Sequence, residues 1–177
     1  LLRALLDRAW SDVLALTLAR KPNGRVDGFV VEGPTAGGHN APPRGKLQLT
    51  SRGEPVYGER DRVDLKKMRD VGLPFWLAGG YGSPEGLRDA LGQGAAGVQV
   101  GTAFALCDES GLREDYRQDI LRRVADGSIE VFTDPQASPA GFPFKVVRLP
   151  ATMADDSLFL NRPRICDLGY LREAYRT

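Results

Sequence analysis

The sequence has few of the residues on which several classes of protein depend. Cysteine occurs only twice, at Cys107 and Cys166, and no CxxC pair exists. We therefore expect no structural zinc site or other bound metal, and we place the protein in the reducing cytoplasm. Histidine occurs once, and Ser110 has no histidine near it in the sequence, so a hydrolase triad has no support.

Long apolar runs and a strong net charge are also absent. No apolar run approaches the roughly 20 residues that cross a bilayer, and Leu1–Asp7 lacks the layout of a signal peptide. The formal net charge is +1, which gives no global electrostatic reason to expect nucleic acid or an anionic membrane. We therefore expect a small-molecule substrate and neither of those partners.

Helix and strand patterns alternate along the first three quarters of the chain. Residues 2–20 carry apolar side chains spaced by threes and fours, which predicts a helix. Val26–Glu32 is a short β-branched run typical of a buried strand. Further strands are expected at 75–78, 98–100 and 129–133, and further helices at 61–71, 84–91 and 112–126. This alternation is typical of parallel strands joined by crossover helices.

The number of strand–helix units limits the fold. Three complete units are too few for a closed (β/α)8 TIM barrel of about 250 residues, but they suffice for half of one. We expect an α/β fold in which residues 1–134 form the C-terminal half of a TIM barrel and residues 135–177 form an extension. An open doubly wound sheet is the competing architecture. Because a helix pattern is already under way at Leu1 and no stop signal precedes Thr177, we expect a fragment of a longer chain.

Two glycine-rich turns follow consecutive predicted strands. The first is Leu77-Ala-Gly79-Gly80-Tyr-Gly82-Ser83-Pro84, and the second is Gly97-Val-Gln99-Val-Gly101-Thr102. Glycine allows a close backbone approach, and a helix that begins just beyond offers unpaired N–H groups and a positive dipole end. Two such turns on neighbouring units predict a clamp for one phosphate group. Taken singly, either turn also fits sugar-phosphate isomerases and synthases.

The single histidine lies beyond the end of the predicted strand at 26–32. It closes the run Glu32-Gly-Pro-Thr-Ala-Gly37-Gly38-His39, in a long loop that extends to Tyr57. Since strand carboxyl ends carry the active site in α/β folds and histidine is the usual base near neutral pH, His39 is a candidate general base. A solvated loop histidine is the alternative, and the neighbouring Gly-Gly and the downstream clamp favour the base.

Three other polar residues have open interpretations. Glu32 is either a second acid or base, or a carboxylate that accepts loop N–H groups, and the second is favoured. Gln99 faces the ligand if Val98 and Val100 face the helices, and its partner is then a cofactor hydroxyl or phosphate, or a neighbouring backbone group. Arg44 is equally well a substrate-anion contact or a surface charge.

Together these motifs resemble the nitronate monooxygenases, once called 2-nitropropane dioxygenases, and the related flavin-dependent enoyl reductases. The segment Glu32–His39 is similar to the family's strand-end Gly-Gly-His motif. Leu77–Gly80 and Gly97–Thr102 are similar to its two phosphate-binding turns. The resemblance is strong over residues 26–106 and weak outside them.

The resemblance implies a TIM-barrel flavoprotein with non-covalent FMN that oxidises alkyl nitronates with O2. It implies that His39 is the base that removes the proton α to the nitro group. It also implies that the FMN phosphate is bound at Gly79, Gly80, Gln99, Gly101 and Thr102. By the same resemblance, the barrel strands that precede this chain are missing and would act as its partner. Asn40–Gly45 and residues 135–177 depart from the family pattern. An enoyl reductase and a flavin-free sugar-phosphate isomerase or lyase stay as alternatives.

Overall fold

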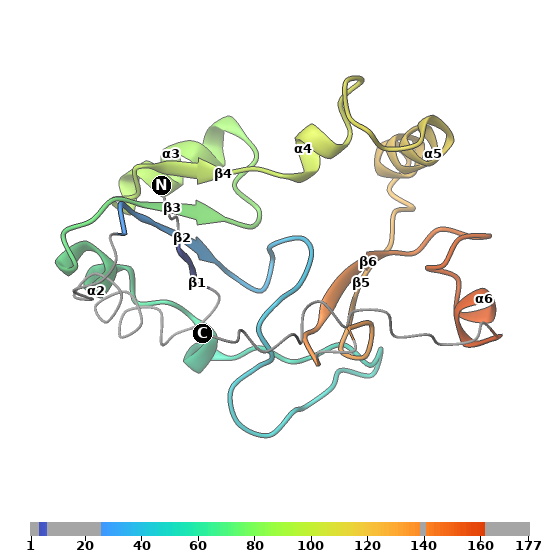
Figure 1. Ribbon diagram of the computed structural model, residues 1–177, viewed down its shortest axis with the longest axis horizontal. Helices are drawn as coiled ribbons and strands as arrows, with labels where there is room; N and C mark the ends of the chain where they lie inside the picture. Colours follow the sequence, from blue (N-terminus) through green and yellow to red (C-terminus); the bar gives the residue numbers. More distant parts are fainter. Residues whose placement is uncertain (1–3, 7–25, 139–140, 162–177) are drawn as a thin grey trace, which may run out of the picture.

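A four-stranded parallel sheet forms the centre of the fold. The computed structural model describes residues 4–6, 26–138 and 141–161 (Figure 1). The strands are β1 (Ala4–Leu6), β2 (Phe29–Glu32), β3 (Phe75–Ala78) and β4 (Gly97–Gln99), and they lie in the order β1-β2-β3-β4. All three pairings are parallel, which confirms the predicted parallel α/β arrangement. Each strand lies beside the next one in sequence, whereas a doubly wound sheet reverses this order at a switch point.

The predicted helix over residues 2–20 is wrong at Ala4–Leu6. These residues form strand β1, which pairs with β2 through Ala4↔Phe29 and Leu6↔Val31. A short apolar run fits a buried strand as well as a helix, and the hydrogen bonds offered by the edge of β2 decide between them here. Residues 7–20 of the predicted helix lie outside the described residues.

The helices begin where their capping residues lie. Asp64 accepts hydrogen bonds from the backbone N–H groups of Lys66 and Lys67, so the helix expected at 61–71 starts only after it. Ser83 Oγ accepts from Gly86 N at 3.0 Å and Pro84 follows at the first helical position, as the sequence predicts. The helical elements are η1 (Glu59–Asp61), α2 (Leu65–Asp70), α3 (Pro84–Gly92), α4 (Thr102–Ala105), α5 (Glu114–Ala125) and α6 (Asp156–Asn161).

The hydrophobic core lies between one face of the sheet and the helices α2 and α3. Phe29 and Phe75 contribute the largest buried side chains of the sheet, and Met68 and Ala90 pack against them from the helices. Leu87 and Leu91 of α3 are 40% and 49% exposed. The short helix α3 approaches the sheet through the small Ala90, which leaves its larger neighbours at the rim.

An antiparallel hairpin lies apart from the parallel sheet. Strand β5 (Val131–Asp134) pairs with β6 (Phe144–Val147), and α6 follows (orange in Figure 1). The strand expected near 129–133 is thus present, shifted slightly, but it does not extend the parallel sheet. Neither β6 nor α6 has a predicted counterpart. The proposed domain division at residue 134 falls inside this hairpin and stays a prediction.

Met68→Ala should destabilise the protein by about 2–5 kcal/mol, the usual cost of truncating a buried methionine. Met68 is fully buried in the core between the helices and the sheet. Denaturant unfolding of the two proteins measures the change. Met153→Ala is the matched control, because Met153 is 53% exposed and its truncation should change the free energy of unfolding by under about 1 kcal/mol. Equal losses in the two variants would contradict the assigned core.

Candidate functional site

The carboxyl ends of β2, β3 and β4 bring three residues of one sheet face into line. Glu32 is in register with Ala78, and Ala78 with Gln99, so their side chains lie on the same face. Gln99 Nε2 donates to Glu32 Oε1 at 3.4 Å across the small Ala78. Val98 packs against the core on the helix side, which places Gln99 on the opposite face. Glu32 therefore has a side-chain amide as a partner, which neither of the two sequence interpretations contains.

The first glycine turn is fixed by close packing. Gly79 and Gly80 have φ values of +94° and +85°, in the left-handed region that favours glycine. A Cβ at Gly79 would lie 2.5 Å from Ala36 N and 2.9 Å from Thr35 Oγ1. Thr35 Oγ1 also donates to the Gly79 carbonyl at 3.1 Å. Gly79 is therefore the point at which the turn after β3 contacts the loop after β2.

The second glycine turn lies beside the first. β3 and β4 are adjacent and parallel, so the turns that follow them lie at the same edge of the sheet. A Cβ at Gly82 would lie 3.3 Å from Val100 Cγ1, which shows that the two segments are in contact. Among the described residues, chain neighbours aside, no heavy atom lies within 4 Å of a Cβ built at Gly101, and Thr35 Oγ1 alone, at 4.0 Å, approaches one built at Gly80. The backbone at Gly80 and Gly101 thus borders open space.

His39 lies in an exposed loop whose backbone pairs with the hairpin. His39 and Phe144 form an isolated antiparallel bridge. Asn40 N donates to Pro143 O at 2.7 Å, and Lys145 N donates to Gly38 O at 2.8 Å. The His39 ring lies 6.0 Å, centroid to centroid, from each of the Phe142 and Phe144 rings. Phe142 and Phe144 are thus neighbours of His39, although no motif in the sequence marks them.

Side-chain hydrogen bonds hold the same loop from within. Asn40 is 3% exposed, and its Nδ2 donates to Ala36 O at 3.1 Å. Tyr57 donates its hydroxyl to Ala41 O at 2.9 Å. Burial, and secondly the nearby Asp61 carboxylate, raise the pKa of Tyr57 to about 12. The hydroxyl therefore stays protonated at neutral pH, and the hydrogen bond that it donates persists.

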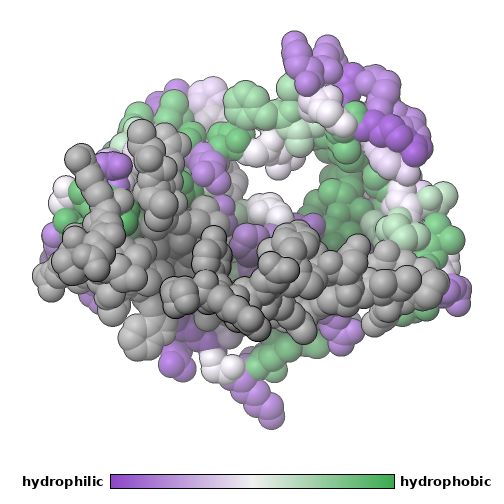
Figure 2. Space-filling view, in the orientation of Figure 1, coloured by the Kyte–Doolittle hydropathy of each residue, from purple (hydrophilic) through white to green (hydrophobic). Residues whose placement is uncertain are grey.

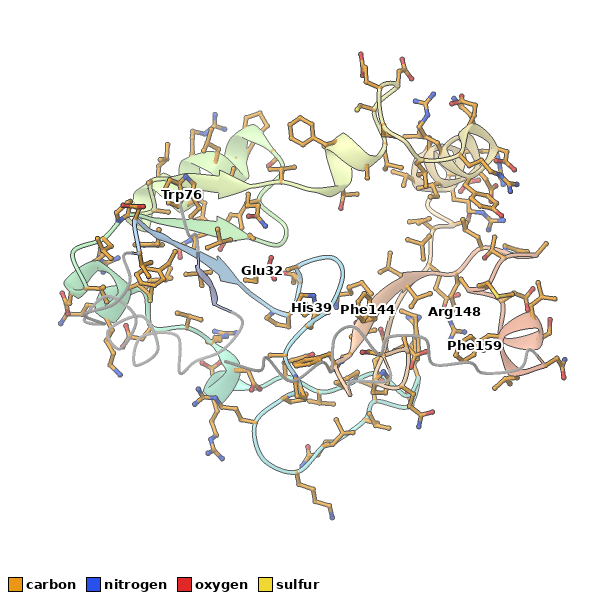
Figure 3. All side chains as sticks on the ribbon, viewed as in Figure 1. Glu32, His39, Trp76, Phe144, Arg148 and Phe159 are labelled. Carbon is orange, nitrogen blue, oxygen red and sulfur yellow. The ribbon has the colours of Figure 1, made fainter. Side chains whose placement is uncertain are left out.

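Glu32, His39 and Phe144 border a common opening in the molecule. In Figure 3 the His39 loop lies between the end of β2 and the hairpin, while the labelled Trp76 lies farther back along the sheet. Figure 2 shows an opening between the sheet on one side and α4, α5 and the hairpin on the other. The predicted base thus faces the same open region as the strand ends.

Arg44 lies at a separate cavity. This cavity has a volume of about 410 Å³ and does not include any of the residues predicted to bind a cofactor. Asp61 closes one side of it by accepting Arg44 N at 2.8 Å and Gly58 N at 2.7 Å. A contact between Arg44 and a substrate anion stays a prediction. The lining residues are Arg44, Gly45, Lys46, Gln48, Val56, Gly58, Glu59, Arg60 and Asp61.

The described part of the chain shows neither a metal-binding cluster nor a membrane-spanning helix. Within residues 26–138 and 141–161, no group of three or more His, Cys, Asp or Glu side chains is arranged to hold a metal ion. Among the same residues, no helix is long and apolar enough to cross a membrane.

Comparisons with known proteins identify the relatives of this chain. The family model for nitronate monooxygenase matches residues 10–140. A nitronate monooxygenase of Pseudomonas aeruginosa is 41% identical over 118 residues, which cover 67% of this chain and 32% of that protein. A protein of Mycobacterium tuberculosis named as a (3aS,4S,5R,7aS)-5-hydroxy-7a-methyl-1-oxo-octahydro-1H-indene-4-carboxyl-CoA dehydrogenase is 33% identical over 104 residues, 59% of this chain and 26% of its own. A probable nitronate monooxygenase of Bacillus subtilis is 36% identical over 96 residues, 54% of this chain and 26% of its own.

The matched segments fix the family and the extent of the likeness. The chain spans about a third or less of the length of these relatives. The family model covers both glycine turns, the His39 loop and the whole parallel sheet beyond β1. The chain belongs to the nitronate monooxygenase family of oxidoreductases.

Proposed function

We propose that this chain is the FMN-phosphate-binding half of a TIM-barrel nitronate monooxygenase. It oxidises alkyl nitronates with O2, and His39 is the general base that forms the nitronate when the substrate is a neutral nitroalkane. The observation that carries the proposal is the placement of the two glycine turns at one edge of adjacent parallel strands, with the His39 loop packed onto the first turn. The sequential strand order supports a barrel, because a closed barrel continues it on both sides.

The residues at the glycine turns fit a phosphate group. Open space beside the backbone of Gly80 and Gly101 leaves room for an anion, and successive backbone N–H groups in such turns form anion-binding concavities. Thr102, at the start of α4, adds a hydroxyl to the same turn. Gln99 already donates to the Glu32 carboxylate, and a carboxylate repels phosphate. We therefore assign Gln99 to a neutral hydroxyl of the cofactor and the phosphate to the backbone of both turns.

The chain's own residues supply position and proton transfer. Bound FMN would supply the two-electron redox chemistry and the reaction with oxygen. An imidazole nitrogen of His39 removes the proton from the carbon next to the nitro group and holds it. The backbone bridge to Phe144 and the hydrogen bonds of Asn40 keep that ring at the opening. Glu32 at the end of β2 keeps Gln99 oriented toward the cofactor.

A second candidate is a flavin-dependent reductase or dehydrogenase that acts on coenzyme A thioesters. The likeness to the Mycobacterium tuberculosis dehydrogenase favours it, because that protein is named for a carboxyl-CoA substrate. The same base would then remove a proton α to a thioester carbonyl. Oxygen consumption with alkyl nitronates, compared with dye reduction by an acyl-CoA, distinguishes the two candidates. The cytoplasm is the proposed compartment of either enzyme, on the ground of the low cysteine content.

His39→Asn should slow turnover of neutral nitroalkanes by roughly 10²–10⁴-fold, the usual size of general-base catalysis. In the protein assembled with the missing half of the barrel, FMN content should stay near normal, because the exposed ring of His39 lies outside the hydrophobic core of the described residues. Steady-state oxygen consumption measures the loss. Pre-formed nitronate serves as an internal control, since its proton is already gone and its rate should fall less. An unchanged rate with neutral nitroalkane would refute the role of His39.

In the protein assembled with the missing half of the barrel, Gly101→Ala should weaken FMN binding by about tenfold or more. The added methyl group would occupy the open space proposed for the phosphate and displace it from a backbone N–H group, and losing one hydrogen bond to a charged group costs about 1.5–3 kcal/mol. The added methyl group meets no atom of the described residues within 4 Å, chain neighbours aside, so the stability of the apoprotein should not change. Gly111→Ala is the matched control, because a Cβ there has equally open surroundings among those residues and the residue lies outside both turns. Flavin fluorescence quenching gives the affinities. Equal FMN affinity in the two variants would show that the phosphate does not bind at this turn.

Residues 1–177 expressed alone should bind FMN poorly and should aggregate or pair. In the described part of the sheet, β1 and β4 are edge strands, and exposed edges and apolar faces promote association. We propose that the missing half of the barrel covers them, as the greater length of the relatives suggests. Light scattering and the flavin absorbance of the purified chain test this. A monomer with stoichiometric FMN would show that the half-barrel proposal is wrong.

A further inference from the structure

The segment that contacts His39 lies beyond the part of the chain that the family model matches. The match ends at residue 140, and Phe142, Pro143 and Phe144 lie just beyond it, after Gly141. This segment is nevertheless hydrogen-bonded to the His39 loop on both sides of the histidine, through Asn40 N to Pro143 O and Lys145 N to Gly38 O. The backbone of 143–145 is therefore held against the base by the chain's own pairing.

The two phenylalanine rings are placed to meet a ligand. Pro143 is fully buried, whereas Phe142 and Phe144 are each 37% exposed. Each ring centroid lies 6.0 Å from that of His39, one edge-on and the other tilted. A buried proline between two half-exposed rings fixes the peptide and leaves apolar ring surface beside the imidazole. Figure 3 shows Phe144 next to His39 at the hairpin side of the opening.

A base must lie within roughly 2.6–3.2 Å of the group from which it takes a proton. A carbon acid in contact with His39 therefore places the groups on its acidic carbon near both phenylalanine rings. Apolar groups gain free energy from such contact in proportion to the area that leaves water. The rings would thus stabilise the binding of a substrate with an alkyl chain on the acidic carbon and would add little binding free energy for a small substrate.

We propose that Phe142 and Phe144 form a specificity wall that selects substrates by the length of the alkyl group on the acidic carbon. This inference rests on the proposed function of His39. The wall accepts linear apolar chains, and it acts by contact with the substrate rather than by positioning His39. Its contribution therefore depends on the substrate's chain length.

The first experiment needs no turnover. Alkanoates from acetate to hexanoate carry a planar anion like that of a nitronate, and they are titrated against the intact protein. The imidazole NMR signal of His39, assigned by its loss in His39→Asn, reports binding. In the unaltered protein, affinity should rise about two- to four-fold for each added methylene, since a fully buried methylene is worth about four-fold. In Phe144→Ala and in Phe142→Ala this dependence should flatten.

Two further variants separate the wall from the fold. Phe144→Leu keeps an apolar side chain in the bridge and should show an intermediate dependence on chain length. Val131→Ala truncates a residue of the same hairpin that is 48% exposed and pairs with Val147, and it should keep the full dependence. Equal dependence on chain length in the unaltered protein, Phe144→Ala and Phe142→Ala would overturn the proposal. So would a failure of every alkanoate to shift the His39 signal.

The second experiment uses the flavin-loaded enzyme. The dependence of kcat/KM on nitronate chain length should follow the same order among the variants. One outcome is that the unaltered enzyme turns over no nitronate and still binds alkanoates according to chain length. That result would contradict the proposed function and support the specificity wall. Turnover whose chain-length dependence is the same in all variants would sink the wall and support the proposed function.

Discussion

The close approach of Gly79 to the backbone of Ala36 is the contact on which the candidate site depends. No side chain fits between them, because a Cβ at Gly79 would lie 2.5 Å from Ala36 N. Through this contact the turn after β3 fixes the start of the loop that carries His39. The Thr35 hydroxyl adds a hydrogen bond to Gly79 O. A residue larger than glycine at position 79 would push the turn after β3 away from the loop after β2. That movement would displace both the proposed phosphate site and the proposed base.

Local signals explain which parts of the fold are predictable from the sequence. The strands at 29–32 and 75–78 are short apolar runs between turn residues, and the Ser83-Pro84 pair marks the start of α3 directly. The strand at Ala4–Leu6 is not predictable from the local sequence, because its conformation is decided by pairing with β2. The same holds for strand β6. Its sequence FKVV has no clear alternation, and its partners lie in β5 and at His39.

The candidate site also contains residues that local sequence signals reveal and residues that depend on distant pairing. The glycine turns were recognisable because glycine is required where a backbone takes a positive φ or approaches another closely, as at Gly79 and Gly80. Phe142 and Phe144 were not recognisable as site residues, because no sequence signal in residues 141–144 indicates pairing with the loop around His39. The amide of Gln99 was predicted to need a partner, but that the partner is Glu32 depends on the register of three strands.

The pairing of position 39 with position 144 also has a consequence for the order of folding. Contacts between residues far apart in sequence form late, because the chain between them must first be ordered. During synthesis the N-terminal part of a chain emerges first, so the parallel sheet and both glycine turns can form before the hairpin exists. The His39 loop acquires its last backbone hydrogen bonds only when Lys145 becomes available. The side of the opening that holds the proposed base can therefore be completed only after residues 143–145 have been synthesised, later than the side proposed to hold the phosphate.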